Sequence, residues 1–242
     1  MLNALQNSLI SLIYPQYCHV CDSCVESIDN GVACSACWTG TLLFSGSEML
    51  CRKCGAFFNE SGVTTELYCH QCEDHFFDTA RAAGIYEKAL AVSAVHLKSQ
   101  PFVPVYLKKA LLAAFDRSQF SSTTLIIPVP LSRKRQSERG FNQAEVLASI
   151  ISKHTSIKLD VASLARVRHT PMHRVAMDKK ARELTVVNAF EVPRPKLIAG
   201  QKVLLVDDIF TSGATASACA KVLKKHGALE VNVLTLARAV LK

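Results

Sequence analysis

The sequence predicts an α/β fold in which a parallel sheet carries helices on both faces, preceded by a small cysteine-rich domain. Residues 203–206 form a continuous aliphatic run, typical of a buried parallel strand, and a helix pattern and another strand pattern follow it. Nine of the ten cysteines lie between residues 18 and 72. Residues 1–80 hold two basic and nine acidic residues, a net charge of −7, so the rest of the +8 chain carries +15. These contrasts predict two domains, residues 1–78 and 79–242.

The first residues do not have the pattern of an export signal. Apolar residues at helical spacing predict a short amphipathic helix, but no basic residue precedes them and polar residues interrupt the stretch; they are Leu2, Leu5, Leu9, Leu12 and Ile13. No run approaches the ~20 apolar residues of a transmembrane helix. We therefore expect no stable membrane insertion and a cytoplasmic protein.

Eight cysteines form four Cys-x-x-Cys pairs, which are Cys18 and Cys21, Cys34 and Cys37, Cys51 and Cys54, and Cys69 and Cys72. Two such pairs complete a tetrahedral Zn²⁺ site. The simplest assignment is sequential, with one structural zinc on the first two pairs and another on the last two; interleaved pairing and a single zinc stay open. Four thiolates also fit an iron–sulfur cluster, but the paired spacing favours zinc, and a cytosolic setting disfavours disulfides. Cys24 is expected to be a spare thiol and Cys219 a core residue.

The middle of the chain predicts a strand followed by a basic loop and a helix. Residues 125–127 read as the strand, and Pro128-Val129-Pro130 ends it. The loop contains Arg133, Lys134, Arg135 and Arg139, and the helix runs to about Lys153. Four cations at the end of a strand suit a polyanion such as pyrophosphate, although a solvated basic loop has the same composition.

The segment KVLLVDDIFTSGAT, residues 202–215, predicts a ligand site. The aliphatic strand ends in Asp207 and Asp208, and a turn of Thr211, Ser212, Gly213, Ala214 and Thr215 then opens a helix that stops near Gly227, before a strand at 230–237. Backbone N–H groups at a helix start bind anions, and carboxylates accept from ribose hydroxyls. The segment resembles the 5-phosphoribosyl-1-pyrophosphate (PRPP) motif of type I phosphoribosyltransferases. An Asp-rich turn of a receiver domain is the alternative.

The chain also resembles the ComF family. PVPLSRKRQSERGFNQA, residues 128–144, is similar to that family's PVPL…RGFNQA signature, and the order of motifs matches from the Cys-x-x-Cys pairs through Leu97-Lys98 to VDDIFTSGAT. The resemblance implies a phosphoribosyltransferase-like domain, PRPP binding, and a link to incoming single-stranded DNA in natural transformation. The basic stretch of residues 166–182 is the candidate for a mobile loop over the reaction centre. Two residues within or beside it depart from the family: His173 stands where Gln is common, and Thr185 stands where Asn is common.

The first functional hypothesis is a PRPP-binding, phosphoribosyltransferase-like protein that supports DNA uptake, with transfer to an unknown acceptor left open. Asp207 and Asp208 would hold the ribose, directly or through Mg²⁺, and the turn 211–215 would hold the 5-phosphate. Arg139 and Arg135 would contact pyrophosphate. No catalytic residue is assigned, because phosphoribosyl transfer needs positioning and charge stabilisation rather than a nucleophile. The cysteine-rich domain is a candidate for the hood that selects the acceptor.

The alternative hypothesis is an accessory protein that binds single-stranded DNA and whose PRPP site is a sensor or vestigial. The +15 C-terminal portion would attract phosphate backbones, along residues 133–139 and 166–182, whereas the −7 N-terminal portion would not. Competence proteins are further possible partners.

Overall fold

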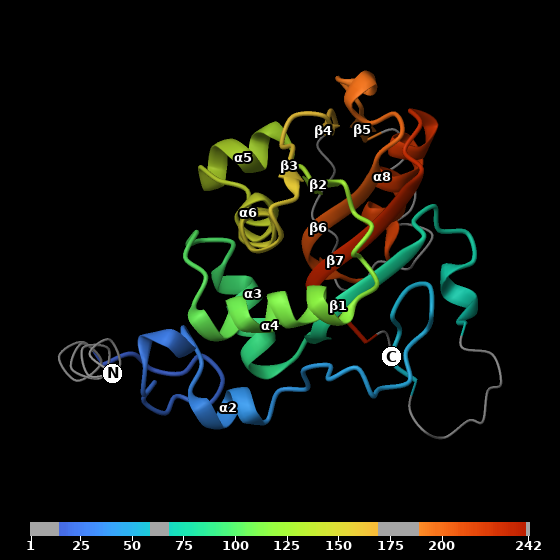
Figure 1. Ribbon diagram of the computed structural model, residues 1–242. Coiled ribbons are helices and arrows are strands. Elements are labelled where there is room, and N and C mark those ends of the chain that lie inside the picture. Colours follow the sequence, from blue (N-terminus) through green and yellow to red (C-terminus); the bar gives the residue numbers. More distant parts are fainter. Residues whose placement is uncertain (1–14, 59–67, 169–188, 241–242) are drawn as a thin grey trace.

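The computed structural model describes residues 15–58, 68–168 and 189–240 (Figure 1). Its main sheet has five parallel strands in the order β1-β7-β6-β2-β3. The strands are β1 (Thr79–Ile85), β2 (Leu125–Pro128), β3 (Lys158–Leu159), β6 (Lys202–Phe210) and β7 (Glu230–Arg238). The predicted parallel α/β sheet is confirmed.

Helices cover both faces of this sheet. One face packs against α3 (Lys88–His96), α4 (Val105–Arg117) and α6 (Gln143–Thr155), and the other packs against α8 (Ala214–Lys225) (Figure 1). The two faces follow from strand alternation. Leu204 and Val206 of β6 lie in the core with α3, α4 and α6, whereas its Val203 and Leu205 pack with α8.

Two elements differ from the expectation. The basic segment predicted as a loop is the helix α5 (Arg133–Arg139), because Ser132 caps its start by accepting from the Arg135 N–H, and Gly140 ends it with a φ of 75°. Strand β6 also continues past the aliphatic run to Phe210, so both aspartates belong to the strand rather than following it.

The remaining elements are short. The strands β4 (Ala165–Arg166) and β5 (Phe190–Glu191) form a two-stranded antiparallel pair. They precede and follow residues 169–188, which lie outside the described residues and include most of the predicted mobile loop. The predicted N-terminal helix also lies outside them. The short helices are η1 (Ile28–Asn30), α2 (Ser35–Thr39), η2 (His70–Cys72) and η3 (Pro195–Leu197).

The cysteine-rich segment packs directly on the sheet domain. Residues 42–44 run along the outer edge of β1, where Phe44 N–H donates to Ala83 and Ile85 N–H donates to Leu42. The buried side chains that precede and follow residues 42–44 in the sequence belong to the two large hydrophobic cores. Cys18, Cys34 and Trp38 belong to the core with α3 and α4, and Cys51, Cys54 and Cys72 belong to the core with α8. The predicted domain boundary falls directly before β1, but within the described residues the cysteine-rich segment has no large core of its own.

Among the described residues, none of the helices has the length and apolar character needed to cross a membrane.

Candidate functional site

Two groups of four cysteines form candidate metal centres. The first group is Cys18, Cys21, Cys34 and Cys37, and the second is Cys51, Cys54, Cys69 and Cys72; within each group all Sγ atoms lie within 4.8 Å of one another. The structure therefore brings the pairs together in the sequential order, not interleaved.

The cysteine geometry fits zinc. Four sulfurs at about 2.3 Å from a tetrahedral Zn²⁺ lie roughly 3.8 Å apart. The structure has 3.6 Å between Cys21 and Cys34 and 3.4 Å between Cys54 and Cys69. These distances are too long for a disulfide of about 2.0 Å. Cys24 is exposed outside both groups, and Cys219 is a fully buried residue of α8 on its core-facing side, as expected.

The two aspartates lie on opposite faces of β6 near its carboxyl end. Asp208 is buried, and its Oδ2 is 3.4 Å from Nζ of Lys98, just after α3. Asp207 lies on the α8 side and keeps partial solvent exposure. Burial and the neighbouring Asp208 charge raise the pKa of Asp207 well above its ordinary value.

The turn after β6 has the geometry of an anion cradle. Gly213 adopts a φ of 80° and caps α8, and its carbonyl accepts from the Ser217 N–H. In the described part of the chain, the backbone N–H groups of Gly213 and Thr215 have no hydrogen-bond partner. Because the positive end of the α8 dipole also points at this turn, it favours a phosphate.

Gly213 is required by close packing as well as by its φ. A Cβ there would lie 2.7 Å from Cε1 of His75 and 2.7 Å from the Phe210 ring. His75 is buried three residues after Cys72, and the next N–H, of Phe76, donates to Ser217 in the first turn of α8. The second cysteine group therefore adjoins the candidate phosphate turn.

Arginines from two segments lie on the Asp207 side. The guanidinium of Arg166 lies 5.3 Å from the Phe190 ring centroid, and its pKa is lowered by burial and by the charge of Arg135, while the Asp207 carboxylate opposes this shift. The charges of Arg135 and Asp207 therefore both act on Arg166. Arg139 instead donates to Gln143 Oε1 at the start of α6, 2.9 Å away. Pyrophosphate contacts by Arg135 and Arg139 stay predictions.

Three neighbours of the candidate site were not assigned from the sequence. Lys98 and Arg166 each stand in segments with a family resemblance, which is a signal that could have identified them. His75 has no comparable signal, because only the fold brings residues 75 and 213 together.

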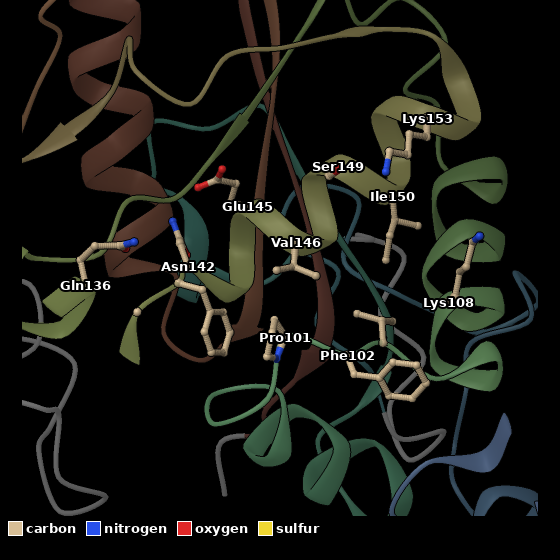
Figure 2. A pocket seen from close by; sticks show the side chains of 13 residues that line it. Pro101, Phe102, Lys108, Gln136, Asn142, Glu145, Val146, Ser149, Ile150 and Lys153 are labelled. Carbon is tan, nitrogen blue, oxygen red and sulfur yellow. The ribbon is translucent and has the colours of Figure 1, made fainter. Parts of the chain in front are cut away.

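A hollow of about 630 Å³ lies beside the Gly140-Phe141-Asn142 segment, on the outer side of α6. Figure 2 shows Val146 and Ile150 of α6 across this hollow from Pro101 and Phe102. Neither the two aspartates nor the turn 211–215 lines it, so the predicted PRPP site is separate from it.

The chain is similar to two known domain families. Residues 139–240 match the phosphoribosyl transferase domain, and residues 9–73 match the double zinc ribbon domain. It is 39% identical over 115 residues to competence protein F of Haemophilus influenzae, covering 47% of this chain and 50% of that protein. Over 137 residues it is 30% identical to competence protein ComFC of Bacillus subtilis, covering 51% and 52%. These matches confirm the resemblance to the ComF family.

The DNA utilization protein YhgH of Escherichia coli K12 is 32% identical over 113 residues, covering 47% of this chain and 48% of that protein. The chain thus matches about half the length of each of these relatives. Among solved structures, it is similar to the allosteric regulatory enzyme of purine biosynthesis, with 22% sequence identity and a TM-score of 0.36. The match covers 63% of this chain and 26% of that chain.

Proposed function

We propose that this chain binds PRPP at the carboxyl end of β6. The observation that carries the proposal is the adjacency of Asp207 and Asp208 to a helix-capping turn whose Gly213 and Thr215 N–H groups have no partner in the described residues. The turn would bind the 5-phosphate and the carboxylates would orient the ribose hydroxyls. Mg²⁺, which takes carboxylate and phosphate oxygens, would neutralise charge on the pyrophosphate.

Phosphoribosyl transfer is the reaction that such a site supports. The bond from ribose C1′ to pyrophosphate breaks, pyrophosphate leaves with the electron pair, and an acceptor nucleophile forms the new bond to C1′. Positive charge develops on the ribose in between, so a fixed carboxylate such as Asp207 would stabilise it. Arg166 lies on the same side, where its guanidinium would bind the leaving pyrophosphate. The acceptor is left open.

The binding proposal is tested by the double variant Asp207→Asn with Asp208→Asn. Each lost charge-assisted contact is worth about 1.5–3 kcal/mol, so we expect the affinity for PRPP with Mg²⁺ to fall by at least ~100-fold in calorimetry. The matched control is Asp116→Asn, an exposed carboxylate on α4, which should leave the affinity unchanged. Equal affinities in the double variant and the parent would rule out the ribose assignment.

We further propose that the protein acts in the cytoplasm in DNA uptake. The support is the naming of its relatives as competence and DNA utilization proteins. A second candidate function, binding of single-stranded DNA, is favoured by two surface features. Arg133 and Lys134 are exposed on α5, and the nearby hollow is lined by the rings of Phe102 and Phe141 and by Lys108 and Lys153. Cations and aromatic rings together suit a nucleic-acid strand.

The DNA hypothesis is tested by replacing Arg133, Lys134 and Arg135 with Ala. If each cation neutralises one phosphate, the dependence of log affinity on log salt should weaken by about 2 for single-stranded DNA. Fluorescence anisotropy with an oligothymidylate at several salt concentrations measures it. A triple Ala variant of Lys158, Lys196 and Lys225, which are exposed elsewhere, removes the same charge. An equal loss in both variants would mean that the α5 surface is not the DNA site.

A further inference from the structure

A second hollow, of about 550 Å³, lies toward the amino-terminal end of the sheet on the α4 side. Its lining includes Arg52, Arg81, Arg117, Ser118, Glu230 and Asn232. In the sheet register Asn232 pairs with Thr79 and Leu204, near the start of β1 and β6, whereas Asp207 pairs with Thr235 near the opposite end. This hollow is therefore distinct from the proposed PRPP site.

Three arginines line the hollow, and in the described residues none of them lies within ion-pair distance of a carboxylate. Arg81 donates to two backbone carbonyls, those of Ala80 and Arg52, at 2.8 and 2.9 Å. Burial lowers the pKa of Arg81 and of Arg117, and nearby Glu48 and Asp116 oppose the shift at Arg117. A guanidinium group that is not paired with a carboxylate retains donors that a phosphate can accept from two at a time.

Asn232 supplies an independent sign of a ligand. Its side chain is only 3% exposed, and its Nδ2 donates to Glu230 Oε1 at 2.7 Å. Its Oδ1 is buried and has no hydrogen-bond partner in the described residues. Such an acceptor costs about 1–3 kcal/mol unless something donates to it. Turning the amide round would set Oδ1 against the Glu230 carboxylate, so the missing partner is a donor such as a hydroxyl group.

We propose that this hollow is a second ligand site, which binds a sugar phosphate. The guanidinium groups of Arg52, Arg81 and Arg117 bind the phosphate, and Asn232 Oδ1 accepts from a sugar hydroxyl. The volume lies within the range of small-molecule sites, about 300–1,000 Å³. The inference goes beyond the proposed function and does not rest on it, because no residue of the turn 211–215 takes part.

A competing explanation is that the arginines balance cysteine charge. The thiolates of Cys51 and Cys54 act on Arg81 and favour its charged form. Arg117 separates the explanations, since it stands at the end of α4 and its charged neighbours are Glu48 and Asp116 rather than cysteines.

The experiment uses the zinc-loaded full chain and two probes, ribose 5-phosphate and inorganic phosphate. Phenylglyoxal modification read by peptide mass spectrometry should show ribose 5-phosphate protecting Arg52 and Arg117 at least several-fold. This readout is specific to each residue, so ligand at the other end of the sheet would protect Arg135 or Arg166 instead. In calorimetry, Arg117→Gln should weaken binding of both probes at this site about 10-fold, and Lys109→Gln, the control on the same helix, should not.

Asn232→Leu separates the sugar contact from the phosphate contact. It should weaken the binding of ribose 5-phosphate about 10-fold and leave the affinity for inorganic phosphate unchanged, because only the sugar offers a hydroxyl group. No protection of Arg52 and Arg117 by either probe would overturn the proposal. A second pair of results would also overturn it: Arg117→Gln binds both probes as tightly as the parent, and Arg81→Gln loses bound zinc. The arginines would then balance the charge of the cysteine thiolates and would not bind a phosphate.

Discussion

Asp207 and Asp208 are neighbours in the sequence but have different surroundings, because successive strand side chains point to opposite faces of a sheet. Asp208 faces Lys98, whose ammonium compensates its charge. Asp207 faces buried Cys219 and the Arg166 side, and it also accepts the Asp208 N–H at 2.9 Å. Its ionised form is disfavoured by burial and by the adjacent carboxylate. A charge held at such a cost is expected at a ligand site rather than in a purely structural strand.

The raised pKa of Asp207 predicts how Asp207→Asn changes the pH dependence of stability. Below the unfolded pKa of about 4, both states are protonated and the group contributes nothing. As the pH rises, the unfolded chain ionises first, so the parent loses stability until the pH passes the raised folded pKa. The free energy of unfolding from urea titrations should therefore favour Asp207→Asn increasingly as the pH rises above about 4. Asp116→Asn serves as the exposed control, and parallel curves for parent and Asp207→Asn would contradict the prediction.

At the scale of elements, β1 is an edge strand that the cysteine-rich segment covers. Residues 42–44 pair with it, and Gly84 lies at the crossing. A Cβ on Gly84 would overlap the carbonyl oxygen of Leu42 and lie 3.0 Å from Leu43 Cα. Because those atoms belong to the backbone, a side chain could not turn aside to make room. The glycine therefore allows two segments of chain to approach closely and leaves the outer edge of the sheet covered.

Gly84→Ala is expected to destabilise the chain through this overlap. Overpacking of this kind costs about 1–3 kcal/mol, which corresponds to a fall in Tm of roughly 2–10 °C for a chain of this size. Differential scanning calorimetry measures the change. Gly40→Ala is the control, since the nearest atom to its added Cβ is the flexible end of Lys88, at 3.3 Å. An unchanged Tm for Gly84→Ala would mean that the crossing is not held as described.

At the scale of the whole molecule, the two cysteine groups belong to opposite faces of one sheet. The first packs with α3 and α4, and the second with α8 beside the turn 211–215. Arg238, at the end of β7, donates to the Cys54 carbonyl and lies 4.6 Å over the Phe210 ring, which itself contacts the Gly213 position. Zinc would therefore support the sheet and the candidate phosphate turn as well as its own segment.

Removal of zinc is therefore expected to destabilise the whole chain. Structural zinc sites contribute several kcal/mol or more, so chelation should lower the Tm of the main calorimetric transition by roughly 10 °C or more. Cys18→Ser and Cys69→Ser test the two groups separately, and Cys24→Ser, outside both groups, should be neutral. If the sheet transition kept its Tm after chelation, residues 79–242 would be an independent folding unit.

The sequence alone predicted the features that depend on local spacing. Cys-x-x-Cys pairs bring two thiolates together wherever the chain goes, and an aliphatic run followed by a turn and a helix predicts a strand with its ligand edge. The parallel sheet and the resemblance to the ComF family were therefore recognisable from the residues, and the sequential cysteine pairing was the simplest interpretation of their order. The basic segment was assigned wrongly as a loop, because its helix depends on the caps at Ser132 and Gly140 rather than on an apolar pattern.

Only the tertiary structure decided which distant residues meet. Lys98 reaches Asp208, His75 packs on Gly213, and Arg52 shares a hollow with Arg117 and Asn232 because the sheet order places their strands and helices side by side. Such contacts link segments up to about 180 residues apart, as between Cys54 and Arg238. They follow from how the layers pack and which faces are buried, and no local spacing in the sequence encodes them.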